Sequence, residues 1–288
     1  MKHFLILLLL SCIILSCVGC AEAPAPADIV TTTLPVYEFT TRLCQGTDLT
    51  VTRLVTESVS CLHDYSLSVR QAKALESAQI VVLSGGGLED FMADTLTGCD
   101  QIIDCSHNIS LYQCHEEHHD HSHETDPHIW LSPEYAKAMA GNILLGLTET
   151  YPQHKEIFAK NLESLNTELD ALESYGHQQL SQLSCRQLIT FHDGFHYLAE
   201  AFDLEILKAV EEESGSEASA MELKELTHLI RNNCLPAIFT ERSGSVSAAG
   251  ILSAETGVSV YSLDMAMSGN SYFEAMYHNI DTLKEALG

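Results

Sequence analysis

Short apolar runs alternate along this chain with longer amphipathic stretches. The short runs are rich in β-branched or other apolar residues, a pattern typical of buried strands. They cover residues 29–33, 49–55, 80–83, 101–104, 187–191, 237–240 and 258–263. Helix candidates lie between them, at 69–78, 89–96, 199–202, 220–232 and 246–255. This alternation of strands and helices predicts parallel sheets of the α/β class.

One long stretch departs from this alternation. Between residues 152 and 184 no strand-like run occurs, and apolar residues recur every three or four positions. These positions are Phe158, Leu162, Leu165, Leu169 and Leu172. The spacing places them on one face of a single long helix, and Pro152 suits its first turn. We expect this helix to bridge an N-terminal α/β lobe (29–151) and a C-terminal one (185–288). A coiled-coil dimer is the alternative, but the short stripe favours packing within the chain.

The first residues form an export signal rather than part of the fold. An apolar run over 4–15 is too short to span a membrane and is typical of a secretory signal. A glycine directly before Cys20 resembles a bacterial lipoprotein cleavage site. We expect removal of residues 1–19, lipid on Cys20, and a Pro/Ala-rich tether over 20–28. Cys17 is the alternative lipidated residue, and secretion without lipid is the alternative to anchoring.

Charge and cysteine content narrow the function classes. The 288 residues include 14 Lys and Arg against 40 Asp and Glu, a formal net charge of −26. Nucleic-acid binding requires a basic face, so this balance argues against it and suits the handling of cations.

Beyond Cys20 the cysteines are odd in number, so they cannot all pair within the chain. They are Cys44, Cys61, Cys99, Cys105, Cys114, Cys185 and Cys234. Cys185 and Cys234 each precede a strand-like run and could bridge neighbouring strands, but sequence leaves the pairing open.

Four polar motifs lie at 61–65, 126–133, 191–193 and 263–265. Three of them follow predicted strands, and the fourth leads into a helix that begins at Pro133. Their candidate ligands are His63, His128, His192 and Asp264. In open α/β sheets, ligands bind beyond the carboxyl ends of the strands. Imidazole and carboxylate are suitable donors for Zn²⁺, so the motifs together favour a metal site.

The motifs resemble those of the substrate-binding proteins of metal-importing ABC transporters, the zinc/manganese group. The chain reads H-D-Y-S-L-S from His63, D-P-H-I-W-L-S-P from Asp126, T-F-H-D-G-F from Thr190, and L-D at Leu263. The similarity covers about residues 28–288. It implies a metal in the cleft between the lobes, with two ligands from each lobe. Those ligands are His63, His128, His192 and Asp264. Four protein ligands make a closed site, so no enzymatic activity is expected.

The resemblance also implies the cargo and the partners. Manganese-selective relatives tend to carry Glu in place of His192, and an imidazole there favours Zn²⁺ because oxygen donors suit Mn²⁺ better. We expect a monomer that is lipid-anchored at the outer face of the cytoplasmic membrane, or periplasmic, and that delivers Zn²⁺ to an ABC permease. The alternatives are an exported zinc hydrolase and a surface metal buffer or adhesin.

Two departures from the family pattern leave the ligand set open. The usual L-D-P is L-D-M here, which leaves Glu57 or Glu241 as alternatives to Asp264. Residues 56–62 lack the family's proline before the first histidine, and Cys61 could bring a thiolate near the metal.

A histidine-rich tract, CHEEHHDHSHE, occupies residues 114–124. It has no apolar periodicity and predicts a surface loop. Its histidines are His115, His118, His119, His121 and His123. The zinc members of the resembled family often carry such a loop as a low-affinity collector; a plain polar insertion is the alternative. The tract contains the zincin signature H-E-x-x-H without the amphipathic helix that signature requires, and the three glycines at 85–87 lack the Lys-Ser/Thr of a phosphate loop.

Overall fold

The computed structural model describes residues 27–57, 62, 65–113, 125–210 and 218–288. The predicted signal peptide and Cys20 lie outside these residues. So do Cys61, His63 and the tract histidines at 115–123.

The N-terminal lobe is a four-stranded sheet with its strands in the order β2-β1-β3-β4, and every neighbouring pair is parallel. In chain order its elements are β1 (Ile29–Thr31), α2 (Leu34–Leu43), β2 (Val51–Arg53), α3 (Val69–Ser77), β3 (Ile80–Leu83), η1 (Asp90–Met92), α4 (Ala93–Leu96) and β4 (Ile102–Asp104). The central strands β1 and β3 consist of apolar and β-branched residues, and most of them are buried.

The C-terminal lobe repeats this arrangement with the order β6-β5-β7-β8, again parallel throughout. Its elements are β5 (Gln187–Phe191), α7 (His196–Ala201), β6 (Glu205–Ala209), α8 (Ala220–Asn232), β7 (Ala237–Glu241), α9 (Ser247–Thr256), β8 (Ser259–Leu263) and α10 (Tyr272–Leu287). The predicted fold class, two parallel α/β lobes joined by a long helix, is confirmed. Strand β6 was not among the predicted strands.

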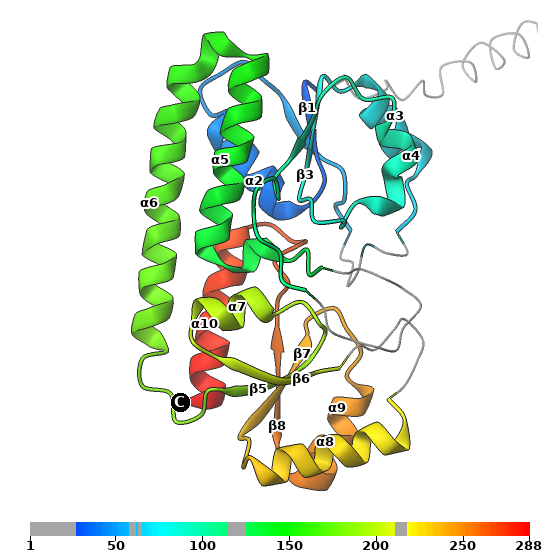
Figure 1. Cartoon of the computed structure of the whole chain (residues 1–288), viewed down its shortest axis with the longest axis vertical. Coiled ribbons are helices and arrows are strands. Elements are labelled where there is room, and N and C mark those ends of the chain that lie inside the picture. The colour runs from blue at the N-terminus through cyan, green and yellow to red at the C-terminus, as the bar shows by residue number, and fades with distance from the viewer. Residues whose placement is uncertain (1–26, 58–61, 63–64, 114–124, 211–217) are drawn as a thin grey trace, which may run out of the picture.

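The lobes are connected by η2 (Ile129–Leu131), α5 (Pro133–Thr150), η3 (Pro152–His154) and α6 (Lys155–Gln179). Figure 1 shows α6 running along one side of the molecule, past both lobes. The long helix is shorter than predicted, because a 3-10 turn precedes it and it ends at Gln179.

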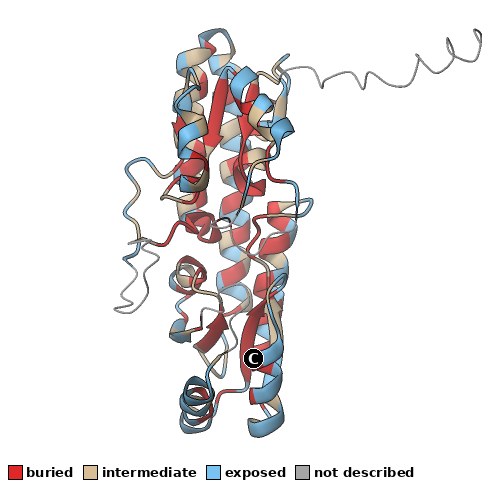
Figure 2. Ribbon diagram, turned by 90° about the vertical axis from the view of Figure 1, so that its right-hand side faces the viewer, coloured by how far each residue is buried: buried red, intermediate tan, exposed pale blue. Residues whose placement is uncertain are grey.

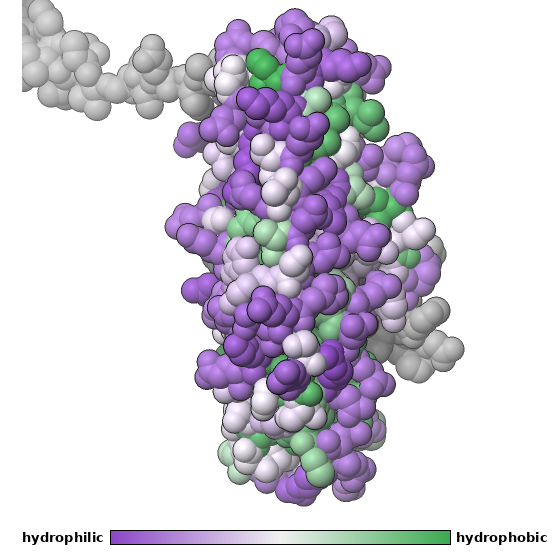
Figure 3. Space-filling model, turned by 90° about the vertical axis from the view of Figure 1, so that its left-hand side faces the viewer, coloured by the Kyte–Doolittle hydropathy of each residue, from purple (hydrophilic) through white to green (hydrophobic). Residues whose placement is uncertain are grey.

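The predicted stripe on α6 faces inward. Phe158, Leu165, Leu169 and Leu172 are buried in a core shared with residues of α2, α5 and α10. The outer surface on the side of the molecule where α6 lies is mostly hydrophilic (Figure 3). The stripe therefore packs within the chain, as predicted, and is not left exposed for a second copy.

One hydrophobic core runs through both lobes (Figure 2). Helix α10 is central to it, since the Tyr272 hydroxyl donates to the Trp130 carbonyl at 2.7 Å and the Tyr272 amide donates to Glu38 Oε2 at 2.6 Å. Within the described residues, no helix has both the length and the apolar character needed to cross a bilayer.

Candidate metal centre

His128 is held in a tight turn just before α5. The Asp126 carboxylate accepts the His128 backbone N–H at 2.9 Å and lies 2.7 Å from His128 Nδ1. Both residues are buried. A carboxylate beside Nδ1 favours the tautomer that carries its proton there, which leaves the Nε2 lone pair available to a metal. Ser132 caps α5 and Pro133 occupies its first turn, so the helix start fixes the end of this turn.

His192 immediately follows β5, at the carboxyl end of the C-terminal sheet. Its Nδ1 lies 3.6 Å from Oε2 of Glu241, the last residue of the neighbouring strand β7. Glu241 is buried. The sequence pattern left Glu241 as an alternative ligand to Asp264. In this structure Glu241 lies beside His192.

The fold brings His128 and His192 together from different lobes. Their ring centroids are 5.2 Å apart and the rings are nearly perpendicular, at 82°. Gly194 allows this approach, since a Cβ on it would lie 2.8 Å from both His128 Nδ1 and His192 Cδ2. Two imidazoles in such proximity are a natural pair of donors for a four-coordinate Zn²⁺.

Asp264 follows β8, but its carboxylate is engaged by protein donors. Oδ1 accepts the Ala266 N–H at 2.8 Å, and Oδ2 accepts from Arg242 Nη1 at 3.1 Å. Among the residues that the structure describes, no group of three or more His, Cys, Asp or Glu is arranged to hold a metal ion. Because His63 lies outside those residues, the four-ligand site of His63, His128, His192 and Asp264 stays a prediction.

Residues on either side of His63 in the sequence are hydrogen-bonded to each other. The Tyr65 hydroxyl donates to Glu57 Oε2 at 2.9 Å, and Gln71 Nε2 donates to the same hydroxyl at 2.6 Å. Gln71 also donates to the Leu54 carbonyl at 2.7 Å, next to the end of β2. The Glu57 carboxylate, the other alternative ligand, is therefore engaged with Tyr65.

Tyr197 was not singled out as a site residue from sequence, although it follows the T-F-H-D-G-F motif. Its hydroxyl accepts the Tyr112 N–H and donates to the Asp126 carbonyl, both at 2.8 Å. Asp126 N–H in turn donates to the Tyr112 carbonyl at 2.9 Å, and Gln113 and Thr125 form an antiparallel bridge. A side chain of the C-terminal lobe thus clamps together the two segments that flank the histidine-rich tract.

A charged pair lies beside this clamp. His196 Nε2 is 2.7 Å from Asp193 Oδ1, and its ring stacks on Tyr112 at 4.3 Å. Burial alone would lower the pKa of His196, but the hydrogen bond to Asp193 and the negative charges of Asp193 and Asp126 together raise it. Burial likewise opposes ionisation of Asp193, yet the His196 contact lowers its pKa overall. The pair is thus stabilised in its charged form.

The glycines at 85–87 form a loop already occupied by a carboxylate of this chain. Glu89 Oε1 accepts the Ser84 N–H at 2.8 Å and the Thr32 hydroxyl at 2.6 Å, while Oε2 accepts the Gly85 N–H at 3.0 Å. All three glycines have positive φ, and a Cβ on Gly86 would lie 3.1 Å from Pro127 Cα. The loop therefore packs against the turn that carries His128.

The comparisons with known proteins agree on one family. The sequence model described as zinc-uptake complex component A, periplasmic (ZnuA), matches residues 29–286. The zinc-binding lipoprotein AdcA of Streptococcus pneumoniae is 30% identical over 307 residues, which cover 99% of this chain but only 61% of AdcA. The high-affinity zinc uptake system protein ZnuA of Bacillus subtilis is 27% identical, over 90% of this chain and 87% of that protein.

Solved structures show the same likeness. A crystal structure of ZnuA aligns with a TM-score of 0.78 and 27% identity, covering 91% of this chain and all of that one (100%). The Zn(II)-bound ZnuA-like domain of Streptococcus pneumoniae AdcA aligns with a TM-score of 0.76 and 29% identity, covering 91% and 99% of the two chains.

Proposed function

Because this chain belongs to the zinc-uptake complex component A family, we propose that it captures Zn²⁺ outside the cytoplasmic membrane and delivers it to an ABC permease. It would act as a solute-binding protein without catalytic activity, as a monomer anchored through lipid on Cys20. The relatives named as zinc-binding lipoprotein and zinc uptake protein support this proposal.

The observation that carries the proposal is the meeting of His128 and His192 between the lobes, with ring centroids 5.2 Å apart. Each imidazole has an acidic neighbour on its Nδ1 side, Asp126 for His128 and Glu241 for His192. The carboxylate hydrogen-bonded to His128 orients that ring and raises its basicity, which strengthens a metal–imidazole bond. Two oriented nitrogen donors favour Zn²⁺ over Mn²⁺, which prefers oxygen.

We propose that His63 and Asp264 complete the ligand set. Asp264 Oδ2 currently accepts from Arg242 at 3.1 Å, so coordination through this oxygen requires the carboxylate to exchange the guanidinium for the metal. Arg242 is thus a competitor of the cargo for Asp264. Such an exchange gives capture and release a local switch that does not depend on wide lobe closure.

Zinc titration of the metal-free chain tests the assignment. We expect one tight equivalent, confirmed by elemental analysis, and a loss of at least about 100-fold in affinity for His192→Ala, since losing one of four ligands removes a coordinate bond. His228→Ala is the matched control, because His228 is exposed on α8 in the far part of the C-terminal lobe. Unchanged zinc affinity in His192→Ala would refute the site, and zinc-dependent hydrolysis in an activity screen would favour the hydrolase.

The histidine-rich tract is proposed as an auxiliary collector. Ordering a loop around a metal costs about 1–2 kcal/mol of backbone entropy per residue fixed, so its affinity should lie below that of a site between folded lobes. Deleting residues 116–124 should leave the tight equivalent and remove only weaker ones in isothermal titration. Loss of the tight phase would mean that the tract supplies ligands to the main site.

A further inference from the structure

Two thiols lie at the beginning of the strands whose other ends carry the candidate metal site. Cys185 precedes β5 and Cys234 precedes β7. The two strands are parallel neighbours, with Thr190 opposite Phe239. Counted back by five residues, this pairing reaches Cys185 and Cys234, which lie just before the two strands.

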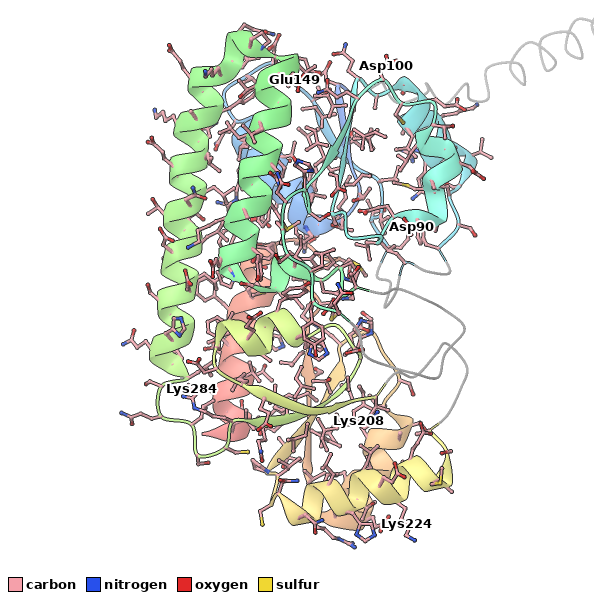
Figure 4. All side chains as sticks on the ribbon, in the orientation of Figure 1. Asp90, Asp100, Glu149, Lys208, Lys224 and Lys284 are labelled. Atoms are coloured by element: carbon pink, nitrogen blue, oxygen red, sulfur yellow. The ribbon has the colours of Figure 1, made fainter. Side chains whose placement is uncertain are left out.

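The same two residues line one shallow pocket of about 400 Å³, together with Arg186, Asn233 and others. Cys185 is partly exposed and Cys234 is exposed, and both are free thiols. Because both side chains are accessible, small reagents can reach the two thiols. The backbone at Cys185 is held by a hydrogen bond from its N–H to the carbonyl of Leu287 at 3.3 Å, one helical turn beyond the Lys284 labelled in Figure 4.

Cys234 occupies a backbone position that usually belongs to glycine. It lies just past the end of α8 with φ at +51°, its N–H donates to the Arg231 carbonyl at 3.3 Å, and the Leu235 N–H donates to the Ile230 carbonyl at 3.1 Å. These paired bonds form a Schellman motif, in which a left-handed residue other than Gly or Asn is disfavoured. Packing does not explain the choice of an exposed cysteine here, but a role for the thiol would.

We propose that Cys185 and Cys234 are a redox-sensitive dithiol that closes into a disulfide between the beginnings of β5 and β7. Neighbouring strands are about 4.8 Å apart, and disulfides span Cα separations of about 4.4–6.8 Å. Among the residues that the structure describes, each sulfur makes one weak contact to a carbonyl at 3.7 Å, from Cys185 to Gln187 and from Cys234 to Arg231. Rotation about the Cα–Cβ bonds can therefore turn the sulfurs toward each other.

The oxidant is a small-molecule or protein disulfide. One cysteine thiolate attacks a sulfur of that disulfide, forming a mixed disulfide and releasing one thiol. The second cysteine thiolate then attacks the protein sulfur and releases the other thiol. Two electrons and two protons pass in total from the cysteine pair to the oxidant, so a bridge forms and one external disulfide is reduced.

The remaining thiols of the described residues are less suited to this chemistry. Cys44 and Cys105 are buried, and burial raises the pKa of Cys44 to about 12 and the pKa of Cys105 well above its usual value. Little thiolate forms under such conditions. Cys99 is partly exposed, and it serves as a control.

Closure would tie together the two strands that present His192 and Glu241 at their far ends. Any effect of the disulfide on zinc affinity rests on the proposed function, whereas formation of the disulfide does not. Thiol chemistry and zinc titration are therefore measured separately, so that the failure of one is distinguishable from the failure of the other.

The test equilibrates the purified full chain with oxidised glutathione, blocks remaining thiols with iodoacetamide, and maps peptides by mass spectrometry. We expect the peptides of Cys185 and Cys234 to be found linked to each other. Because the bridge closes a loop of about fifty residues, oxidised protein should melt roughly 5–15 °C above reduced protein. Cys99→Ser should preserve this gap between the two forms.

Two variants guard against a folding artefact. Cys234→Gly suits the left-handed position, so it should fold, lose the oxidation-dependent shift in melting temperature, and melt above reduced wild type. Cys185→Ser should lose the same shift. The proposal is overturned if Cys185 and Cys234 stay alkylatable, if each carries glutathione separately, or if either is linked to another cysteine.

Discussion

Gly194 lies where the two lobes bring their histidines together, and the missing side chain leaves room for both rings. A Cβ at this position would approach His128 Nδ1, His192 Cδ2 and Met265 Cε, each at 2.8 Å. Its φ is not in the left-handed region, so crowding rather than backbone strain makes glycine necessary here.

Gly194→Ala should therefore push the two imidazoles apart and lower zinc affinity by about tenfold or more, since a metal site tolerates little misplacement of its ligands. The far-ultraviolet circular dichroism should stay native. Gly141→Ala is the control, because a Cβ there has nothing within 4 Å and sits inside α5. That control should stabilise the fold by about 0.5–1 kcal/mol and leave zinc affinity unchanged.

Glu89 is a second residue whose behaviour depends on its surroundings. Burial raises the pKa of its carboxyl to about 7, against the hydrogen bonds from Thr32, Gly85 and Ser84 that favour the charged form. The folded state therefore binds this proton more tightly than the unfolded state. Its contribution to stability is fully present below about pH 4.5 and is lost as the pH rises through 7.

Glu89→Gln removes this titration, and the difference between wild type and variant should reveal it. Between pH 4.5 and 7.5 the free energy of unfolding of the metal-free wild type should fall relative to the variant, by up to about 3 kcal/mol. Urea unfolding at several pH values measures this difference. Parallel curves for the two proteins would show that Glu89 does not titrate in this range. Glu163→Gln, on the exposed face of α6, should leave the wild-type curve unchanged.

At the scale of elements, the sequence predicts those strands and helices whose own residues show a clear apolar pattern. The run Ile80–Leu83 is apolar throughout and reads as a buried central strand. Strand β6 places Glu205 and Lys208 among its apolar residues because it lies at the sheet edge, and this mixed pattern hides it. The turn that holds His128 coincides with the compact motif D-P-H-I-W-L-S-P at residues 126–133.

Other features depend on partners far away in the sequence. The hydroxyl of Tyr197 meets Asp126, 71 residues earlier, and the Glu89 carboxylate meets Thr32, 57 residues earlier. Neither residue differs in local sequence from an ordinary helical tyrosine or surface glutamate. Only the folded arrangement reveals that Tyr197 holds Tyr112 and Asp126 together and that Glu89 fills a glycine loop.

Helix α6 offers a direct test of how its stripe is used. Leu169 is fully buried against the shared core, whereas Leu162 is only partly buried. Leu169→Ala should cost about 2–5 kcal/mol of unfolding free energy, and Leu162→Ala clearly less. Urea unfolding compares them, and sedimentation should show the same monomer mass throughout. Equal costs, or dissociation of a dimer in the variants, would instead support a seam between two chains.

Across the whole molecule, Tyr197 is one of the side chains that join the lobes. Tyr197→Phe keeps the ring but leaves the Tyr112 N–H and the Asp126 carbonyl without this hydroxyl. We expect a loss of about 1–3 kcal/mol in stability, from buried polar groups that lose a partner. Zinc affinity should fall several-fold, since Asp126 orients His128.

Tyr135→Phe is the matched control, because Tyr135 packs edge-on against the Tyr197 ring at 5.4 Å and is not part of the clamp. It should change neither property appreciably. If Tyr197→Phe loses stability but keeps full zinc affinity, the clamp supports the fold without positioning the histidine.

The contact between α2 and α10 has a consequence for how the chain is made. The Tyr272 amide reaches Glu38 across 234 residues of sequence, and the Leu34 N–H donates to the Met267 carbonyl. During synthesis, helix α2 emerges long before these residues exist. Contacts of such long range slow folding, because the intervening chain must be ordered first. Helix α2 can therefore complete its packing only after the last helix has been synthesised.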